Sequence, residues 1–264
     1  MVRDHRHEKA RCGRRRPFAF TLLEMIVTVA IIALLIAILS SSLVKARSAV
    51  RGFVCKNKLK TVAFEFNLFA DDLVLPEAPD GLGTSGNHFR IETFQERLYR
   101  INHFWDLRDQ AEADYEPSRQ PLMCPAGPQE LRRRAGLPCS KHAVGPPENV
   151  SMCFNMRLDK ISVRIEDRWV LQDVALTGRI LEHPSVPLAF DVDGAAAKEK
   201  RLLPYYAAPP AGDPGIYGTG LFWHPSLRHD GKLNAAFIGG HVLSSCRPET
   251  EPGWDWAYQP PATR

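Results

Sequence analysis

The sequence predicts an α+β protein in which one long N-terminal helix packs on an antiparallel sheet domain. Between Pro17 and Pro76 there is no proline and a single glycine, Gly52, so one helix can run through this stretch. Further along, short runs of alternating apolar and polar residues are separated by Gly and Pro, a pattern typical of strands. A chain of 264 residues has room for this helix and one globular domain of ordinary size.

The first half of the predicted helix is long and apolar enough to cross a membrane. Residues 25–44 carry no charge, and at about 1.5 Å per residue they reach roughly 30 Å, one hydrocarbon core. A secretory signal peptide would have a shorter apolar region, of about 7–15 residues, and a simple signal anchor would leave Glu24 without a role. Lys and Arg number seven in residues 1–19 and six in residues 45–60, which favours a cytoplasmic N-terminus only slightly.

The head of this segment resembles a known processing site. The residues "FAFTLLEM", followed by the apolar run, are similar to the prepilin-type cleavage and methylation segment of type IV pilins and type II secretion pseudopilins. The resemblance implies that a membrane prepilin peptidase cuts between Ala19 and Phe20 and that the new amine of Phe20 is methylated. That family usually has glycine at the position of Ala19.

The resemblance also implies a role for Glu24 in assembly. After cleavage, the α-amino group of Phe20 would have a reference pKa of about 7.7–8.0 and be largely cationic at neutral pH. Glu24 lies four residues further on. In the family this glutamate is assigned to pairing with the amine of a neighbouring subunit, so that a carboxylate that is costly in a membrane gains a partner on assembly.

The resemblance implies a domain organisation, a location and a set of partners. It divides the chain into a leader (1–19), a transmembrane helix (20–44), an amphipathic continuation of that helix (45–75) and a periplasmic α+β domain of pilin-like fold (76–264). The protein would be a single-pass protein of the bacterial inner membrane. Its partners would be prepilin peptidase, membrane lipid, copies of itself and other pilin-like subunits. No nucleic-acid partner is predicted, because the net charge is only +4 and much of it lies in the leader.

Beyond the apolar segment, the spacing of apolar residues predicts two helical faces that pack in a core. The first is the continuation of the long helix, with Leu59, Val62, Ala63, Phe66, Phe69, Ala70 and Leu73 at three- and four-residue steps. The second is a separate helix with Ile91, Phe94, Leu98, Ile101 and Trp105 at helical spacing.

The remaining elements are shorter. Residues 117–147 hold seven prolines and are expected to form a loop. Alternation over residues 161–171 predicts a β-hairpin, and residues 185–194 predict a buried strand that ends in a turn. Residues 207–220, rich in proline and glycine, are expected to be an exposed crossing.

The C-terminal stretch "RHDGKLNAAFIGGHVLSS" predicts a tight hairpin at Gly239 and Gly240. It resembles a signature of prepilin-like proteins abundant in planctomycete-type bacteria, in which an Asp-Gly-His-Val sequence follows a histidine. The residues in register are His229, Asn234, Phe237, Gly240, His241 and Val242, whereas Gly239 stands where the signature has Asp. The side chains of His229 and His241 are expected to form hydrogen bonds across the hairpin.

Catalysis is not expected, because nucleophile elbows, phosphate-binding loops and HExxH are all absent from the sequence. No cofactor is predicted, and no metal apart from structural calcium. By analogy with major pseudopilins, Asp191 and Asp193 are weak candidates for structural calcium. Five cysteines remain after removal of the leader, so at least one stays free or pairs between subunits.

The sequence therefore predicts a non-enzymatic, pilin- or pseudopilin-like structural subunit that assembles into a type IV pilus or a type II secretion-like filament. The alternative is a monomeric periplasmic binding domain that uses the prepilin segment only as an anchor.

Overall fold

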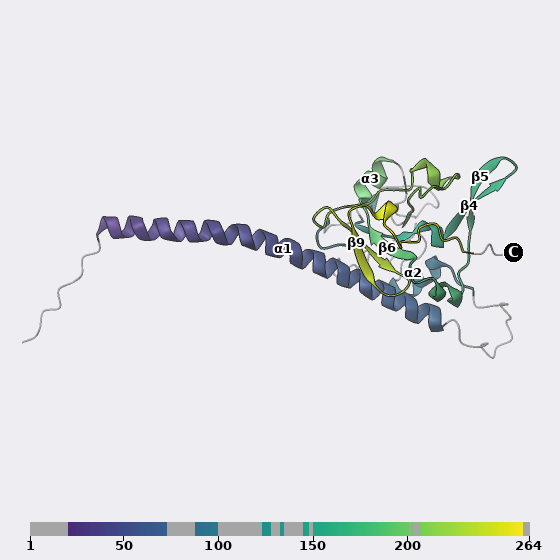
Figure 1. Ribbon diagram of the computed structural model, residues 1–264, viewed down its shortest axis with the longest axis horizontal. Coiled ribbons are helices and arrows are strands. Elements are labelled where there is room, and N and C mark those ends of the chain that lie inside the picture. The colour runs from purple at the N-terminus through teal and green to yellow at the C-terminus, as the bar shows by residue number, and fades with distance from the viewer. Residues whose placement is uncertain are drawn as a thin grey trace, which may run out of the picture. The chain divides into compact units, whose positions relative to one another are not determined.

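The computed structural model consists of two compact units, residues 1–46 and 47–264 (Figure 1). It describes residues 21–72, 88–99, 123–127, 133–134, 145–147, 150–200, 202 and 206–260. The predicted long helix is confirmed as α1, Leu22–Asp72. The two units divide within α1, so its second half belongs to the C-terminal unit.

The first part of α1 is apolar on every side. Its Leu, Ile and Val side chains are exposed, and α1 is long and apolar enough to cross a membrane. The few hydroxyl groups in this part are bonded to the helix backbone: Thr28 Oγ1 donates to the Met25 carbonyl at 2.9 Å and Ser40 Oγ to the Ile36 carbonyl at 2.7 Å. These bonds satisfy groups that would otherwise be unpaired in hydrocarbon.

The C-terminal unit is built around a five-stranded sheet with the order β7-β3-β6-β8-β9, which confirms the α+β class. Its strands are β3 (Met152–Asn155), β6 (Pro187–Asp191), β7 (Tyr206–Ala207), β8 (Leu233–Phe237) and β9 (Val242–Ser245). All neighbours pair antiparallel except β3 and β7, which are parallel. Every residue of β3, β6, β7 and β8 is buried, which agrees with the mostly apolar composition of these strands.

The second half of α1 contributes one face to the core of this unit. The buried face consists of Cys55, Leu59, Val62, Ala63, Phe66 and Ala70, which confirms most of the predicted stripe. Phe66 stacks edge-on against Phe94 of α2 (Ile91–Tyr99), with ring centroids 5.2 Å apart. In α2, however, Leu98 is 41% exposed, so the predicted burial of this residue is wrong. Ile101 and Trp105 lie outside the described residues.

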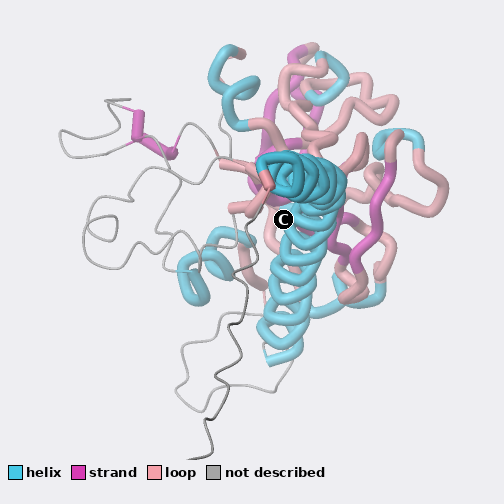
Figure 2. The backbone as a smooth tube through the Cα atoms, turned by 90° about the vertical axis from the view of Figure 1, so that its left-hand side faces the viewer, coloured by secondary structure: helices cyan, strands magenta, loops and turns pink. Residues whose placement is uncertain are grey.

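Smaller elements accompany the sheet, and Figure 2 shows how helices, strands and loops alternate along the backbone. The predicted hairpin is confirmed as β4 (Lys160–Ile165) paired with β5 (Arg168–Asp173). Its turn residues Glu166 and Asp167 have φ values of 46° and 62°, as a two-residue hairpin turn requires. The other short elements are β1 (Arg133–Arg134), β2 (Gly145–Pro147), α3 (Gly194–Glu199) and 3-10 turns at Met156–Leu158, Gly178–Glu182, Tyr217–Thr219 and Pro248–Thr250. In the described part of the expected loop over 117–147, β1 and β2 pair with each other.

Residues 207–220 are not the exposed crossing that their composition predicts. Ala207, Ala208 and Tyr217 are buried in this segment. The Arg157 side chain, which is 3% exposed, forms an ion pair with Asp213 at 3.1 Å and lies over the Tyr217 ring at 4.6 Å. A buried guanidinium therefore holds the segment against the sheet, although its composition is that of a surface loop.

Asp159 is a second buried charge, located between β3 and β4. Its side chain is 1% exposed and lies 3.5 Å from Arg90 and 3.8 Å from Lys160, distances too long for strong hydrogen bonds. Burial, with a further contribution from Glu92, raises the pKa of Asp159 to about 6. The native state therefore binds this proton more tightly than the unfolded chain, whose Asp pKa is about 3.9.

We expect Asp159 to make the protein less stable as the pH rises. The stabilising effect of its proton is complete below about pH 4 and is lost as the pH passes about 6, which costs on the order of 2–3 kcal/mol of unfolding free energy. An Asp159→Asn variant lacks this dependence. Urea unfolding of both proteins in detergent at pH 4.5 and pH 7 should show the wild type losing stability relative to the variant, and equal losses would contradict the assignment.

Candidate functional site: the helix start and a buried thiol cluster

The start of α1 is capped by reciprocal hydrogen bonds between Thr21 and Glu24. The Thr21 backbone N–H and its hydroxyl both donate to Glu24 Oε2 at 2.8 Å, and the Glu24 backbone N–H donates to Thr21 Oγ1 at 3.3 Å. This is a capping box, which pairs backbone N–H groups that a helix start leaves without partners. Glu24 therefore stabilises its own helix before any second subunit is considered.

Sequence reasoning missed this local role, although the Thr-x-x-Glu spacing of residues 21–24 is the signal that identifies a capping box. The carboxylate also lies in the first helical turn, where the helix dipole favours a negative charge. The predicted cleavage residues Ala19 and Phe20 lie outside the described residues.

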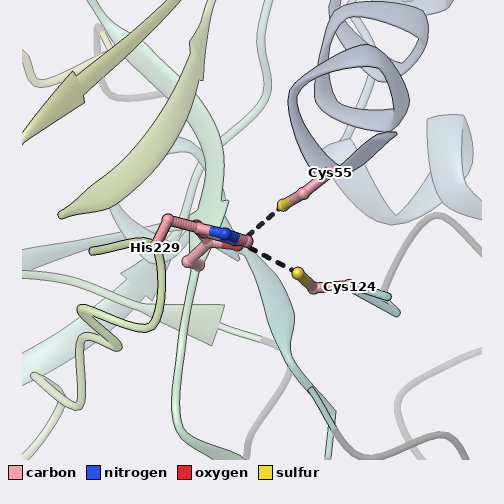
Figure 3. Close-up of side chains that lie close together, drawn as sticks. Cys55, Cys124 and His229 are labelled. Atoms are coloured by element: carbon pink, nitrogen blue, oxygen red, sulfur yellow. Dashed lines mark hydrogen bonds and ion pairs between the residues drawn. The ribbon is translucent and has the colours of Figure 1, made fainter. Parts of the chain in front are cut away.

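In the C-terminal unit, four side chains of the kinds that can bind a proton or a metal ion meet in the core. Cys55 comes from α1, Cys124 from the segment 123–127, Asp191 from the end of β6 and His229 from the turn before β8. Figure 3 shows Cys55, Cys124 and His229 pointing toward one another from three separate parts of the chain. One ligand atom from each of the four residues lies within 4.8 Å of every other.

Hydrogen bonds connect the members of this cluster. The Cys55 thiol donates to Asp191 Oδ1 at 3.2 Å, and Cys124 Sγ lies 3.2 Å from His229 Nε2. The same His229 nitrogen lies 3.4 Å from Asp191 Oδ2. A surrounding layer holds the members in place: the Asn234 backbone N–H donates to Asp191 Oδ2 at 2.9 Å, and the Ala126 backbone N–H donates to Cys124 Sγ at 3.4 Å.

These contacts separate charge within the cluster. The neighbouring Cys55 side chain and the contact with His229 together lower the pKa of the Cys124 thiol to about 5, although burial opposes this shift. Burial alone would lower the pKa of His229, but its bonds to Asp191 and Cys124 raise that pKa to about 9. These shifts favour the thiolate form of Cys124 and the protonated form of His229.

The predicted C-terminal hairpin is confirmed, but the expected role of His229 is wrong. Strands β8 and β9 pair antiparallel, and Gly240 has a φ of 80° in the turn. The His229 side chain bonds to Asp191 and Cys124 instead of reaching across the hairpin. The His241 ring stacks on Phe237, with centroids 4.7 Å apart and planes 6° from parallel.

Two other signature positions have clear structural roles. Asn234 is buried, and its side chain accepts a hydrogen bond from Ser244 at 2.7 Å and lies 3.7 Å from Cys55 Sγ. A Cβ at Gly239 would lie 2.8 Å from the Pro184 side chain and 3.0 Å from its carbonyl oxygen. The aspartate that the signature has at this position would therefore collide with Pro184.

The two calcium candidates lie in different surroundings. Asp191 is fully buried among the thiols, whereas Asp193 is exposed and accepts bonds from the Ala195 and Ala196 backbone N–H groups at 3.1 and 3.2 Å, at the start of α3. The structure thus does not gather their oxygens into one site. The cysteines that it describes, Cys55, Cys124, Cys153 and Cys246, are free thiols.

Comparison with known proteins concerns the N-terminal segment. A family model for the prokaryotic N-terminal methylation motif matches residues 14–40. No characterised protein and no solved structure is similar enough to the chain to count as a match. The matched residues include the basic residues before the predicted cleavage site, Thr21, Glu24 and the first turns of α1. The chain therefore carries a prokaryotic N-terminal methylation motif, the type of segment found at the start of prepilin-like proteins.

Proposed function

We propose that the protein is a pilin- or pseudopilin-like structural subunit that is cleaved by prepilin peptidase and assembles into a type IV pilus or a type II secretion-like filament. The observation that carries the proposal is the methylation motif over residues 14–40, which leads into an apolar helix long enough to cross a membrane. In this proposal, the protein is anchored in the inner membrane with its N-terminus in the cytoplasm. Its sheet domain lies in the periplasm, and its partners are copies of itself and other pilin-like subunits.

A second apolar face on α1 supports assembly. In the half of α1 that belongs to the C-terminal unit, one face is buried in the core, yet Val50, Val54, Phe64 and Leu68 follow the helix on another face. Their side chains are 61, 39, 60 and 56% exposed. Large apolar side chains gathered on one surface mark sites of association. Packing of α1 against α1 helices of neighbouring subunits would cover them.

The thiol cluster supports a structural role over an enzymatic one. A Cys-His-Asp catalytic arrangement uses both ring nitrogens of histidine, one toward the sulfur and the other toward the carboxylate. Here Cys124 and Asp191 both contact Nε2 of His229. Cys124 is also completely buried, where no substrate reaches its sulfur. We infer that the protein is not an enzyme.

The proposal predicts that the mature protein begins with N-methylated Phe20. Top-down mass spectrometry of membrane-extracted protein, from hosts with and without prepilin peptidase, reads the cleavage site and the methyl group together. Ala19→Gly should be cleaved at least as well as the wild type, whereas Ala19→Val should block cleavage because the added bulk lies next to the scissile bond. An intact N-terminus in the presence of the peptidase would overturn the proposal.

A further inference from the structure

The geometry points to a structural zinc site formed by Cys55, Cys124, Asp191 and His229. Zinc in proteins is bound by cysteine sulfur, histidine nitrogen and carboxylate oxygen, and structural sites use four protein ligands. The cluster supplies four such groups, and all four residues are buried or nearly so, with His229 the most exposed at 9% of its side chain. A site closed by four protein ligands has no position for a substrate, which agrees with a structural role.

The spacing of the donor atoms fits a tetrahedral ion. With Zn–S bonds of about 2.3 Å and Zn–N or Zn–O bonds of about 2.0–2.2 Å, neighbouring donor atoms lie roughly 3.3–3.8 Å apart. Cys55 Sγ lies 3.2 Å from Asp191 Oδ1, and His229 Nε2 lies 3.2 Å from Cys124 Sγ and 3.4 Å from the other Asp191 oxygen, Oδ2. With one oxygen taken from Asp191, all four donor atoms lie within 4.8 Å of one another. An ion at the centre would need only small side-chain shifts.

Ligand chemistry selects zinc over calcium or magnesium. Calcium and magnesium require six or more oxygen ligands, whereas two of the four donors here are sulfur. Two thiolates, one carboxylate and a neutral imidazole around Zn²⁺ leave one net negative charge. Lys58 lies beside the cluster and donates to the Met123 carbonyl at 3.1 Å, next to Cys124, so its ammonium group is placed to balance that charge.

The surroundings complete the site. The Asn234 and Ala126 backbone N–H groups already orient Asp191 and Cys124, as the outer layer of a metal site does. A hollow of about 310 Å³, lined by Gly52, Lys56, Asp230 and other residues, opens beside His229 and offers a route for the ion. Cys55 lies on α1 and Asp191 lies at the end of β6, 136 residues further along the sequence. A zinc ion bound by both residues would therefore connect α1 to the sheet of the C-terminal unit. This inference does not depend on filament formation.

Zinc binding can be tested on the full-length chain purified in detergent with reduced thiols and stripped of metal by a chelator. Titration with Zn²⁺ against a chromophoric chelator should give one equivalent per chain. Titration with Co²⁺ should give the visible bands of tetrahedral cobalt together with thiolate-to-cobalt charge transfer. Zinc should also raise the unfolding temperature of the wild type and protect Cys55 and Cys124, but not the exposed Cys246, from alkylation.

Variants then locate the site. Cys124→Ser should weaken zinc binding by more than about a hundredfold, whereas Cys246→Ser, which removes a cysteine outside the cluster, should bind like the wild type. The wild-type cobalt spectrum keeps the test decisive if Cys124→Ser fails to fold. Two results would overturn the inference: reduced wild type that takes up no zinc, or a cobalt spectrum without thiolate charge transfer.

Discussion

Replacing Glu24 with glutamine is expected to abolish most self-association of the processed protein while leaving membrane insertion unchanged or improved. Insertion improves because a carboxylate within a membrane segment raises the free energy of insertion by up to about 2.5–3.5 kcal/mol. Association fails because the neighbour's Phe20 amine loses its counter-charge, and breaking one side of a buried ion pair costs on the order of 3–5 kcal/mol. At 1.4 kcal/mol per tenfold, this is a loss of more than about a hundredfold in association. Crosslinking in membranes, with extraction by alkali as the insertion assay, measures both effects.

The capping box provides the matched control for this experiment. Glutamine keeps an acceptor for the Thr21 N–H, so Glu24→Gln removes the charge but preserves the helix cap. Thr21→Ala does the reverse, because it keeps the carboxylate and removes the hydroxyl that bonds to the Glu24 N–H. If the charge drives assembly, Glu24→Gln fails and Thr21→Ala assembles. If Glu24→Gln gives as much crosslinked oligomer as the wild type, the chain is an anchored monomer and the glutamate serves only its own helix.

The second large effect is expected at the buried ion pair of the C-terminal unit. Asp213→Ala should lower the unfolding free energy by about 3–5 kcal/mol, because it leaves the Arg157 guanidinium uncompensated in the core. The two side chains are only 3% and 5% exposed and lie 3.1 Å apart. Asp213 Oδ1 also accepts from the Gly215 N–H at 2.6 Å, so its removal releases the loop as well. Urea unfolding of the full chain in detergent provides the measurement.

Two further variants show whether burial is the cause. Arg157→Met removes the charge together with its need for a partner, so the double variant Arg157→Met, Asp213→Ala should be less destabilised than the sum of the two single changes. Arg164→Ala breaks an exposed pair, with Asp167, whose side chains are 61% and 90% exposed, and should change stability by less than about 1 kcal/mol. If Asp213→Ala is as mild as Arg164→Ala, the pair is not a determinant of stability.

Features set by neighbouring residues could be predicted from the sequence. The absence of proline and the apolar periodicity were sufficient for α1, because a helix bonds each residue to one four positions away. The hairpins β4–β5 and β8–β9 followed from alternation around residues that tolerate a turn, and their partners are close in sequence. The processing segment, residues 14–40, is also contiguous, so its pattern is complete in the sequence.

The thiol cluster and the buried ion pair could be found only from the tertiary structure, because their residues are distant in sequence. Cys124 and His229 are 105 residues apart, and Cys124 has no cysteine or histidine at the short spacing that identifies a metal site. Likewise, the segment 207–220 has the proline and glycine content of a surface loop, but its Asp213 pairs with the buried Arg157, which lies 56 residues away in sequence. This distant contact, which local composition does not reveal, holds the segment against the sheet. Local pattern determines an element's type, but which charged and sulfur-bearing side chains meet depends on how the sheet brings those elements together.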